Sequence, residues 1–284
     1  MRTCKIGTRT NDPKIKSSNL FLLKLKKLLL EIKTNMKASL PSFFAFKSAV
    51  DLVRIGRDYD GGYLVSQTDI EKSEVLIGLG LYDDWSFESD FVAINDVDVY
   101  AYDASLDFNF WIKRVIIESI KNPFGFYAIK KFLSYKKFFK GKHKHIKKFV
   151  GLNSYCQNYL TLTSVLRMIK KDNIFLKIDV EGAEYRFLDD LISNQNRISG
   201  LVIELHDCDI HLKKIKEFIR SFDLNLIHIH ANNHAPIKLE DGLPVVIELT
   251  FSKFSELSNS NNLPNILDMP CNKNEGEIQL IVSN

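Results

Sequence analysis

The feature that most constrains this chain is the regular return of short apolar runs from residue 74 onward. Helix-length segments separate EVLIGLG (74–80), VDVYAYDAS (97–105), HIKKFVGLNS (145–154), NIFLKIDVEG (173–182) and GLVIELH (200–206). Strands that alternate with helices form crossover units, which build a parallel sheet covered on both faces. The chain has 284 residues, 45% of them hydrophobic, which is enough to bury such a core. The pattern predicts an α/β fold of three layers.

The last two apolar runs are arranged differently. LNLIHIHAN (224–232) and PVVIELTF (244–251) are joined by NHAPIKLEDGL, which is too short for a crossover helix. We expect them to form an antiparallel hairpin at one edge of a mostly parallel, seven-stranded sheet. This hairpin distinguishes the methyltransferase variant of the Rossmann-like folds from plain dinucleotide-binding domains.

The N-terminal residues have a separate character. The stretch SNLFLLKLKKLLLEIKT (18–34) has the period of an amphipathic helix, with lysines opposite the apolar face. We expect residues 1–50 to form a basic helical extension, which either packs on the domain or lies on a membrane surface. Residues 51–284 are expected to form the domain itself.

Several features predict a cytoplasmic location. Lysines interrupt the apolar N-terminal run, so neither a signal peptide nor a spanning helix is expected. The four cysteines are scattered without a metal-binding or disulfide spacing, and we expect reduced thiols. High Asn, Lys and Ile content is typical of an AT-rich bacterial genome.

A glycine-containing turn follows the first run of the series. In LIGLGLYDDWSFESDF (76–91), Gly78 and Gly80 end a strand, and a helix is expected to begin near Ser86. Glycine lets a ligand approach the backbone, and the first amides of a helix attract anions. Asp103 ends the next strand, at about the 20-residue interval from which an acid reaches a ribose. A helix cap is the alternative for Asp103. Together these residues indicate an adenosine-containing cofactor, and they fit NAD as well as S-adenosylmethionine.

Acids and a histidine follow the next two strands. Asp179 and Glu181 end one strand, and Glu204, His206 and Asp207 end the other. Ligands of open α/β sheets bind beyond the carboxyl ends of the strands, so these groups are expected at one crevice. Methyl transfer to a hydroxyl requires removal of a proton, which such groups can accept.

At this point the chain resembles a known family. LKIDVEGAEYRFL (176–188) is similar to the signature of the FkbM-type methyltransferases, which have the class I S-adenosylmethionine-dependent fold. The resemblance extends over about residues 50–284, through RIGRDYDGGYLV (54–65), DDWSFE (83–88), VIELH (202–206), HIHANN (228–233) and VIELTF (246–251). It implies S-adenosylmethionine as cofactor and often a sugar or polyketide hydroxyl as acceptor.

The resemblance also implies roles for individual residues. Gly78, Gly80 and Ser86 would cradle the methionine part of the cofactor, and Asp103 would hold the ribose. Asp179 would lie beside the sulfonium, where many O-methyltransferases have a catalytic or metal-binding acid. The alternative for Asp179 is a capping residue at the strand-to-helix turn. Glu181 is either a second catalytic group or a structural acid that binds loop amides.

Two histidines and a metal are further candidates. His206 and His230 both end strands, and either could be the general base. Mg²⁺ or Mn²⁺ held by Asp179 with His206 or Asp207 is the alternative way to activate the acceptor. In the turn RDYDGGY (57–63), Arg57 and Tyr63 are expected either to face the site or to belong to a plain hairpin turn.

A basic, aromatic insertion is predicted at about residues 112–145. Residues 112–150 hold twelve Lys or Arg against one acid, Glu118, interleaved with aromatic residues. Nucleic acid, membrane headgroups and an acidic glycan or glycolipid would all fit this charge, and a solvated basic face is the alternative. The apolar spacing favours a lid or a membrane-facing helix, and a nucleic-acid partner is not expected.

The expected function is therefore O-methylation of a sugar hydroxyl in a bacterial surface glycan or glycolipid, by a cytoplasmic enzyme at the inner membrane face. A catalytically silent membrane or scaffold protein on the same fold is one alternative. A nucleic-acid methyltransferase is the other.

Overall fold

The computed structural model describes residues 36–121, 126–151, 158–258 and 261–283. The helix expected at 18–34 lies outside the described residues. Residues 36–50 are part of the domain, because β1 (Lys37–Leu40) pairs in parallel with β13 (Gln279–Val282) and η1 (Ser42–Phe44) follows it. Ala38, Leu40 and Phe44 are buried in the main core. The domain therefore includes residues before the expected boundary at 51.

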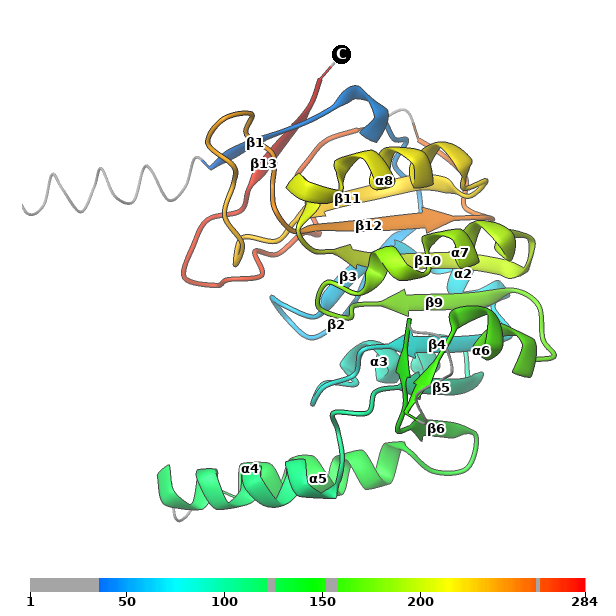
Figure 1. Cartoon of the computed structure of the whole chain (residues 1–284), viewed down its shortest axis with the longest axis vertical. Coiled ribbons are helices and arrows are strands. Elements are labelled where there is room, and N and C mark those ends of the chain that lie inside the picture. Colours follow the sequence, from blue (N-terminus) through cyan, green and yellow to red (C-terminus); the bar gives the residue numbers. More distant parts are fainter. Residues whose placement is uncertain (1–35, 122–125, 152–157, 259–260, 284) are drawn as a thin grey trace, which may run out of the picture.

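The central sheet has seven strands (Figure 1). Their order is β11 (Asn225–Ala231), β12 (Ile247–Ser252), β10 (Ile198–Leu205), β9 (Ile174–Ile178), β4 (Val75–Leu79), β5 (Asp98–Tyr102) and β6 (His143–Ile146). β12 runs antiparallel to both of its neighbours, and the other neighbouring pairs are parallel. This confirms the α/β prediction and the antiparallel edge hairpin. It is the strand order of the class I methyltransferase fold.

Helices cover both faces of the sheet because strand side chains alternate in direction. Ile77 and Leu176 belong to the larger core, whereas their neighbours Leu76 and Phe175 belong to the second core. The larger core is completed by α6 (Leu162–Met168), α7 (Leu188–Ser193) and α8 (Cys208–Ser221). The second core is completed by α2 (Gln67–Lys72), α3 (Ser86–Ile94) and the hairpin of β2 (Leu52–Gly56) with β3 (Gly62–Ser66). The result is the predicted three-layer sandwich.

The third strand lies earlier than the sequence pattern indicated. The sheet uses residues 143–146, whereas the apolar pair of β7 (Phe149–Val150) joins β8 (Tyr159–Leu160) in a separate two-stranded sheet. Two lysines, Lys147 and Lys148, separate the strands. The apolar character at 149–150 therefore serves a small sheet beside the main one.

The predicted insertion forms a helical arm. α4 (Phe108–Lys121) and α5 (Tyr127–Phe138) connect β5 to β6 and extend from the β6 side of the sheet (Figure 1). We call residues 108–121 and 126–139 the arm. It is the β5–β6 crossover itself, and residues 143–145 of the predicted insertion belong to β6. None of the helices in the described ranges combines the length and apolarity needed to cross a bilayer.

The close approach of the turns after β4 and β9 generates a first prediction. Gly80 has φ +82°, and a Cβ there would collide with the carbonyl oxygen of Asp179. Gly141 also has a positive φ, +65°, but nothing lies within 4 Å of its Cβ position. Gly80→Ala should therefore lower the free energy of unfolding by about 3–5 kcal/mol, against about 1 kcal/mol for the control Gly141→Ala. Denaturant unfolding of both variants measures this, and equal losses would contradict the close contact.

Candidate active site

A cavity of about 460 Å³ lies at the carboxyl ends of β4, β5 and β9. Its wall is formed by the turn after β4 (79–84), Asp103 after β5, residues 179–181 after β9, and parts of the β2–β3 turn. Phe149, Val150 and Tyr159 of the small sheet also line it. This is the position where open α/β sheets bind ligands, and the size suits a small organic molecule.

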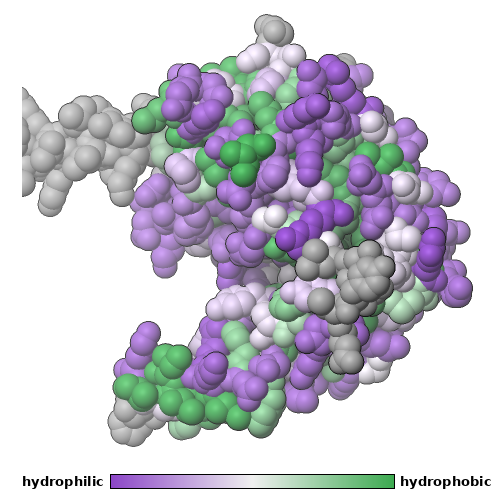
Figure 2. Space-filling view, in the orientation of Figure 1, coloured by the Kyte–Doolittle hydropathy of each residue, from purple (hydrophilic) through white to green (hydrophobic). Residues whose placement is uncertain are grey.

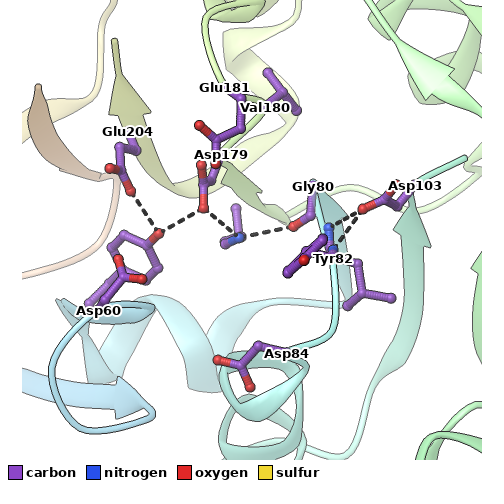
Figure 3. A network of polar contacts seen from close by, with 12 residues as sticks. Asp60, Gly80, Tyr82, Asp84, Asp103, Asp179, Val180, Glu181 and Glu204 are labelled. Carbon is purple, nitrogen blue, oxygen red and sulfur yellow. Dashed lines mark hydrogen bonds and ion pairs between the residues drawn. The ribbon is translucent and has the colours of Figure 1, made fainter. Parts of the chain in front are cut away.

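Asp103 lines the cavity, but its carboxylate is occupied by the protein (Figure 3). One oxygen accepts hydrogen bonds from the amides of Leu81 (3.0 Å) and Tyr82 (2.7 Å). The other accepts from the amide (2.7 Å) and hydroxyl (2.6 Å) of Ser105. Burial raises the pKa of Asp103, but these hydrogen bonds outweigh it and the pKa is lowered. In this structure Asp103 holds the turn after β4 in place.

The other predicted cofactor residues divide into two groups. Gly80 lines the cavity. Gly78 instead makes room for Glu88, since a Cβ at Gly78 would lie 2.7 Å from Oε1 of Glu88. The amide and hydroxyl of Ser86 both donate to Asp84, at 3.1 Å. Neither Gly78 nor Ser86 is among the residues that line the cavity.

The wall also includes a buried lysine that the sequence analysis did not single out, Lys177. Lys177 Nζ donates to the carbonyl oxygen of Gly80 at 3.0 Å and lies 3.4 Å from Oδ2 of Asp179. Burial lowers the pKa of Lys177. The negative charges of Asp179, Glu88 and Glu204 raise it by a larger amount, so the net shift is upward. Burial raises the pKa of Glu88 to about 7, against the opposing charge of Lys177. The signal in the sequence was a lysine inside the apolar strand IFLKI.

Tyr63 of β3 connects the two acids that end β9 and β10. Its hydroxyl lies 3.1 Å from Oε2 of Glu204 and 3.3 Å from Oδ2 of Asp179 (Figure 3). Burial, together with the charges of Asp179 and Glu248, raises the pKa of Glu204 to about 8. Asn232 donates to the other oxygen of Glu204 at 2.8 Å. Of this group only Asp179 lines the cavity.

The acids of the EGAE segment have roles different from those expected. Glu181 has φ +53°, and its side chain is 87% exposed. The loop amides are instead bound by Glu184, which is fully buried and accepts from the amides of Val180 (3.2 Å) and Gly182 (3.1 Å). The structural role proposed for Glu181 therefore belongs to Glu184.

His206 is held by carboxylates. Its Nδ1 lies 3.1 Å from Oε1 of Glu184, and its Nε2 lies 3.5 Å from Glu181. Burial lowers the pKa of His206, but the hydrogen bond and charge of Glu184 outweigh this and raise it to about 9. An imidazole that keeps its proton near neutral pH is a poor general base, so this geometry does not favour the predicted role.

His230 lies away from the cavity. It is buried on β11 between Glu248 and Glu277, whose oxygens lie 2.9 Å from Nδ1 and Nε2 respectively. Burial lowers the pKa of His230, but Glu248 and the hydrogen bonds raise it well above the ordinary value. His230 does not line the cavity, because β12 separates β11 from β10. Both ring nitrogens are used structurally, which does not favour the predicted role as base.

The predicted metal ligands are brought together in part. Asp179, Glu181 and His206 each offer one ligand atom within 4.8 Å of the others. Asp207 is an exposed residue at the N-cap position of α8 and is not part of this group. A metal at this site stays a prediction, and we derive no step through it.

Known proteins resemble this chain only distantly. No model of a known protein family matches the chain, and no curated protein matches it. An rRNA methylase from Streptococcus thermophilus is 9% identical, with 66% of this chain and 94% of that one covered, at a TM-score of 0.37. A precorrin-6y C5,15-methyltransferase from Geobacter metallireducens is 14% identical, with 66% and 84% covered, at a TM-score of 0.36.

TrmK from M. capricolum, in complex with S-adenosyl-homocysteine, is 12% identical, with 69% of each chain covered and a TM-score of 0.36. Because these TM-scores lie below 0.5, the assignment of the fold rests on the strand order described above. The specific resemblance to the FkbM-type family stays a prediction.

The occupied carboxylate of Asp103 yields a second prediction. Asp103→Asn replaces one of the two acceptor oxygens with an NH2 group, so that two of the four hydrogen bonds are lost, and it should lower the free energy of unfolding by about 2–4 kcal/mol. A matched control at the start of the same strand is Asp98→Asn, which removes only a partly exposed ion pair with Lys171 and should lose less than about 1 kcal/mol. Thermal and urea unfolding distinguish them. Equal stability of the two variants would show that Asp103 does not hold the turn.

The pKa of His206 yields a prediction about pH. Because the folded protein raises this pKa from 6.5 to about 9, protonation of His206 stabilises the fold fully below pH 6.5. That stabilisation disappears as the pH rises through about 9. The difference in unfolding free energy between the wild type and His206→Gln should therefore shrink by about 2 kcal/mol from pH 6 to pH 10. Urea titrations at the two pH values test this, and a constant difference would exclude a stabilising imidazolium.

Proposed function

We propose that this protein is an S-adenosylmethionine-dependent methyltransferase that methylates a hydroxyl group of a sugar in a surface glycan or glycolipid. The main support is the cavity at the carboxyl ends of β4, β5 and β9, with Asp179 in its wall. The strand order and the resemblance of LKIDVEGAEYRFL to the FkbM-type signature support the same activity.

The lining of the cavity fits the cofactor chemically. Acids outnumber cations in the wall, where seven carboxylates (Asp60, Asp83, Asp84, Glu88, Asp103, Asp179 and Glu181) accompany Arg57, Lys177 and Arg186. Such a wall favours a ligand that carries a sulfonium charge. The aromatic rings of Phe149 and Tyr159 offer flat apolar surface to an adenine. When bound, S-adenosylmethionine would supply an electrophilic methyl group on a positively charged sulfur.

Asp179 is the residue that we assign to proton removal. Glu204 has a pKa of about 8 and keeps its proton near neutral pH, and His206 already carries one. Asp179 lines the cavity, with its Oδ2 between the hydroxyl of Tyr63 (3.3 Å) and the ammonium of Lys177 (3.4 Å). These two donors hold the carboxylate in one orientation, so that its other oxygen, Oδ1, can accept the proton of an acceptor hydroxyl.

The resemblance to the FkbM-type family supports a sugar acceptor. For the location we propose the cytoplasmic side of the membrane. The two cysteines within the described residues, Cys208 and Cys271, are free and buried, as expected for a protein kept in a reducing compartment.

Two measurements test the activity. Calorimetry should detect saturable binding of S-adenosylmethionine to the wild type. The purified protein should also transfer radiolabelled methyl groups from S-adenosylmethionine to a glycan or glycolipid fraction prepared from cells that lack the gene. Absence of cofactor binding would favour a catalytically silent protein on the same fold. Label in RNA or DNA instead of glycan would overturn the proposed sugar acceptor.

The assignment of Asp179 gives a further prediction. Asp179→Asn should lower kcat by roughly 100-fold or more, while the affinity for S-adenosylmethionine changes little, because only proton transfer is lost. The matched control is Glu181→Gln, which changes a neighbouring, exposed carboxylate and should keep kcat within about threefold. If Asp179→Asn retains wild-type kcat, or if Glu181→Gln loses as much, Asp179 is not the base.

A further inference from the structure

The arm carries an unusual concentration of exposed apolar side chains. Nine of the 21 large apolar residues that are exposed within the described ranges belong to it. They gather at the end of the molecule where α4 and α5 lie, as the green atoms of Figure 2 show. They are Phe108, Ile112, Ile116, Ile117, Ile120, Phe126, Tyr127, Ile129 and Leu133. Patches of this kind on a protein surface usually mark an interaction site.

Four of these side chains form a continuous ridge on α4. Phe108, Ile112, Ile116 and Ile120 are spaced four residues apart, so they follow one another along one side of the helix. The ridge is about 18 Å long at 1.5 Å per residue. Ile120, at its end, is 77% exposed. We call these four residues the α4 ridge.

The α4 ridge is not needed to hold the arm on the domain. A different side of α4 does this through Trp111, which is buried against Tyr135 of α5 with ring centres 5.5 Å apart. Tyr135 in turn packs on Trp85 at 5.8 Å. These rings belong to a separate small core between the arm and the sheet. The ridge therefore remains available on the outer side.

The charge of the arm is mostly positive. The arm holds seven Lys or Arg and one acid, Glu118. That acid is used internally, since its carboxylate accepts hydrogen bonds from the amides of Tyr127 and Ala128 at the start of α5. Five lysines of the arm are exposed, namely Lys113, Lys121, Lys130, Lys136 and Lys137. An arm that has both an exposed apolar ridge and exposed lysines fits a surface with an apolar interior and an anionic outer layer.

We propose that the arm docks on an anionic lipid bilayer, with the α4 ridge inserted among the acyl chains and the lysines at the headgroups. A second copy of the chain fits less well, because a symmetric contact would bring two lysine-rich surfaces together without acids to oppose them. Nucleic acid also fits less well, since isoleucine side chains offer neither stacking nor hydrogen bonds to bases.

Docking at the arm would fix the orientation of the cavity. Arg114 of α4 forms an ion pair with Asp83, and Phe110 packs on Tyr82 with ring centres 5.6 Å apart. Tyr82 and Asp83 both line the cavity. A bilayer bound at the ridge would therefore lie beside the turn that forms one wall of the site. The docking inference itself does not depend on the proposed methyl transfer.

Flotation of the full chain with lipid vesicles tests the proposal. The wild type should float with vesicles of phosphatidylglycerol and phosphatidylcholine in equal parts, and much less with pure phosphatidylcholine or at high salt. Ile116→Ser with Ile120→Ser should lower binding roughly tenfold or more. Lys130→Gln with Lys137→Gln should lower it roughly tenfold and reduce the dependence on salt.

The matched control is Ile210→Ser with Leu239→Ser, which removes two exposed apolar side chains outside the arm and should leave binding unchanged. Circular dichroism and thermal unfolding confirm that each variant is folded. The proposal is overturned if the wild type does not bind anionic vesicles, or if the ridge variant binds as well as the control. It is also overturned if sedimentation shows a wild-type dimer that the ridge variant dissociates. Binding of S-adenosylmethionine, measured separately on the same proteins, tests only the proposed function.

Discussion

The site depends on one buried ammonium group. Lys177 lies near the carboxyl end of β9, in the cavity wall, and donates to the carbonyl oxygen of Gly80 in the turn after β4. Its charge also holds Asp179 and offsets Glu88 of α3, so a single cation joins three elements. A buried charge is tolerated only when it is paired and hydrogen-bonded. The absence of a side chain at Gly78 gives Glu88 the space to approach, which explains that glycine without a ligand.

Much of the fold could be predicted because hydrophobic periodicity and linker length carry the information. The apolar runs gave the parallel strands, and the short connection after β11 gave the antiparallel pair. The third strand was misplaced, since Phe149 and Val150 are as apolar as a sheet strand although they belong to another sheet. Apolar character indicates that a segment is covered but does not say by which element.

The site was predictable in its location and less so in its roles. Asp179 lines the cavity as the strand-end argument requires. The sequence did not indicate that Glu184, and not Glu181, binds the loop amides. Glu181 and Gly182 have positive φ, and in this loop the side chain of Glu184 faces the amides. The predicted role of His230 as a base at the cavity is not favoured, and the reason is the order of the strands. Although it ends a strand, the intervening β12 places it about 10 Å from β10 at the usual strand spacing.

The pairing of β1 with β13 has a consequence for how the chain folds. Lys37 and Gln279 are partners in this parallel ladder, and Leu40 is partner to Val282. Most of the described residues lie between the two strands, so the ladder closes a long loop. Contacts of such long sequence separation form late and slowly. During synthesis on the ribosome, we therefore expect Ala38 and Leu40 of β1 to stay unpaired until β13 has been synthesised. We therefore expect this small sheet to assemble after the central sheet.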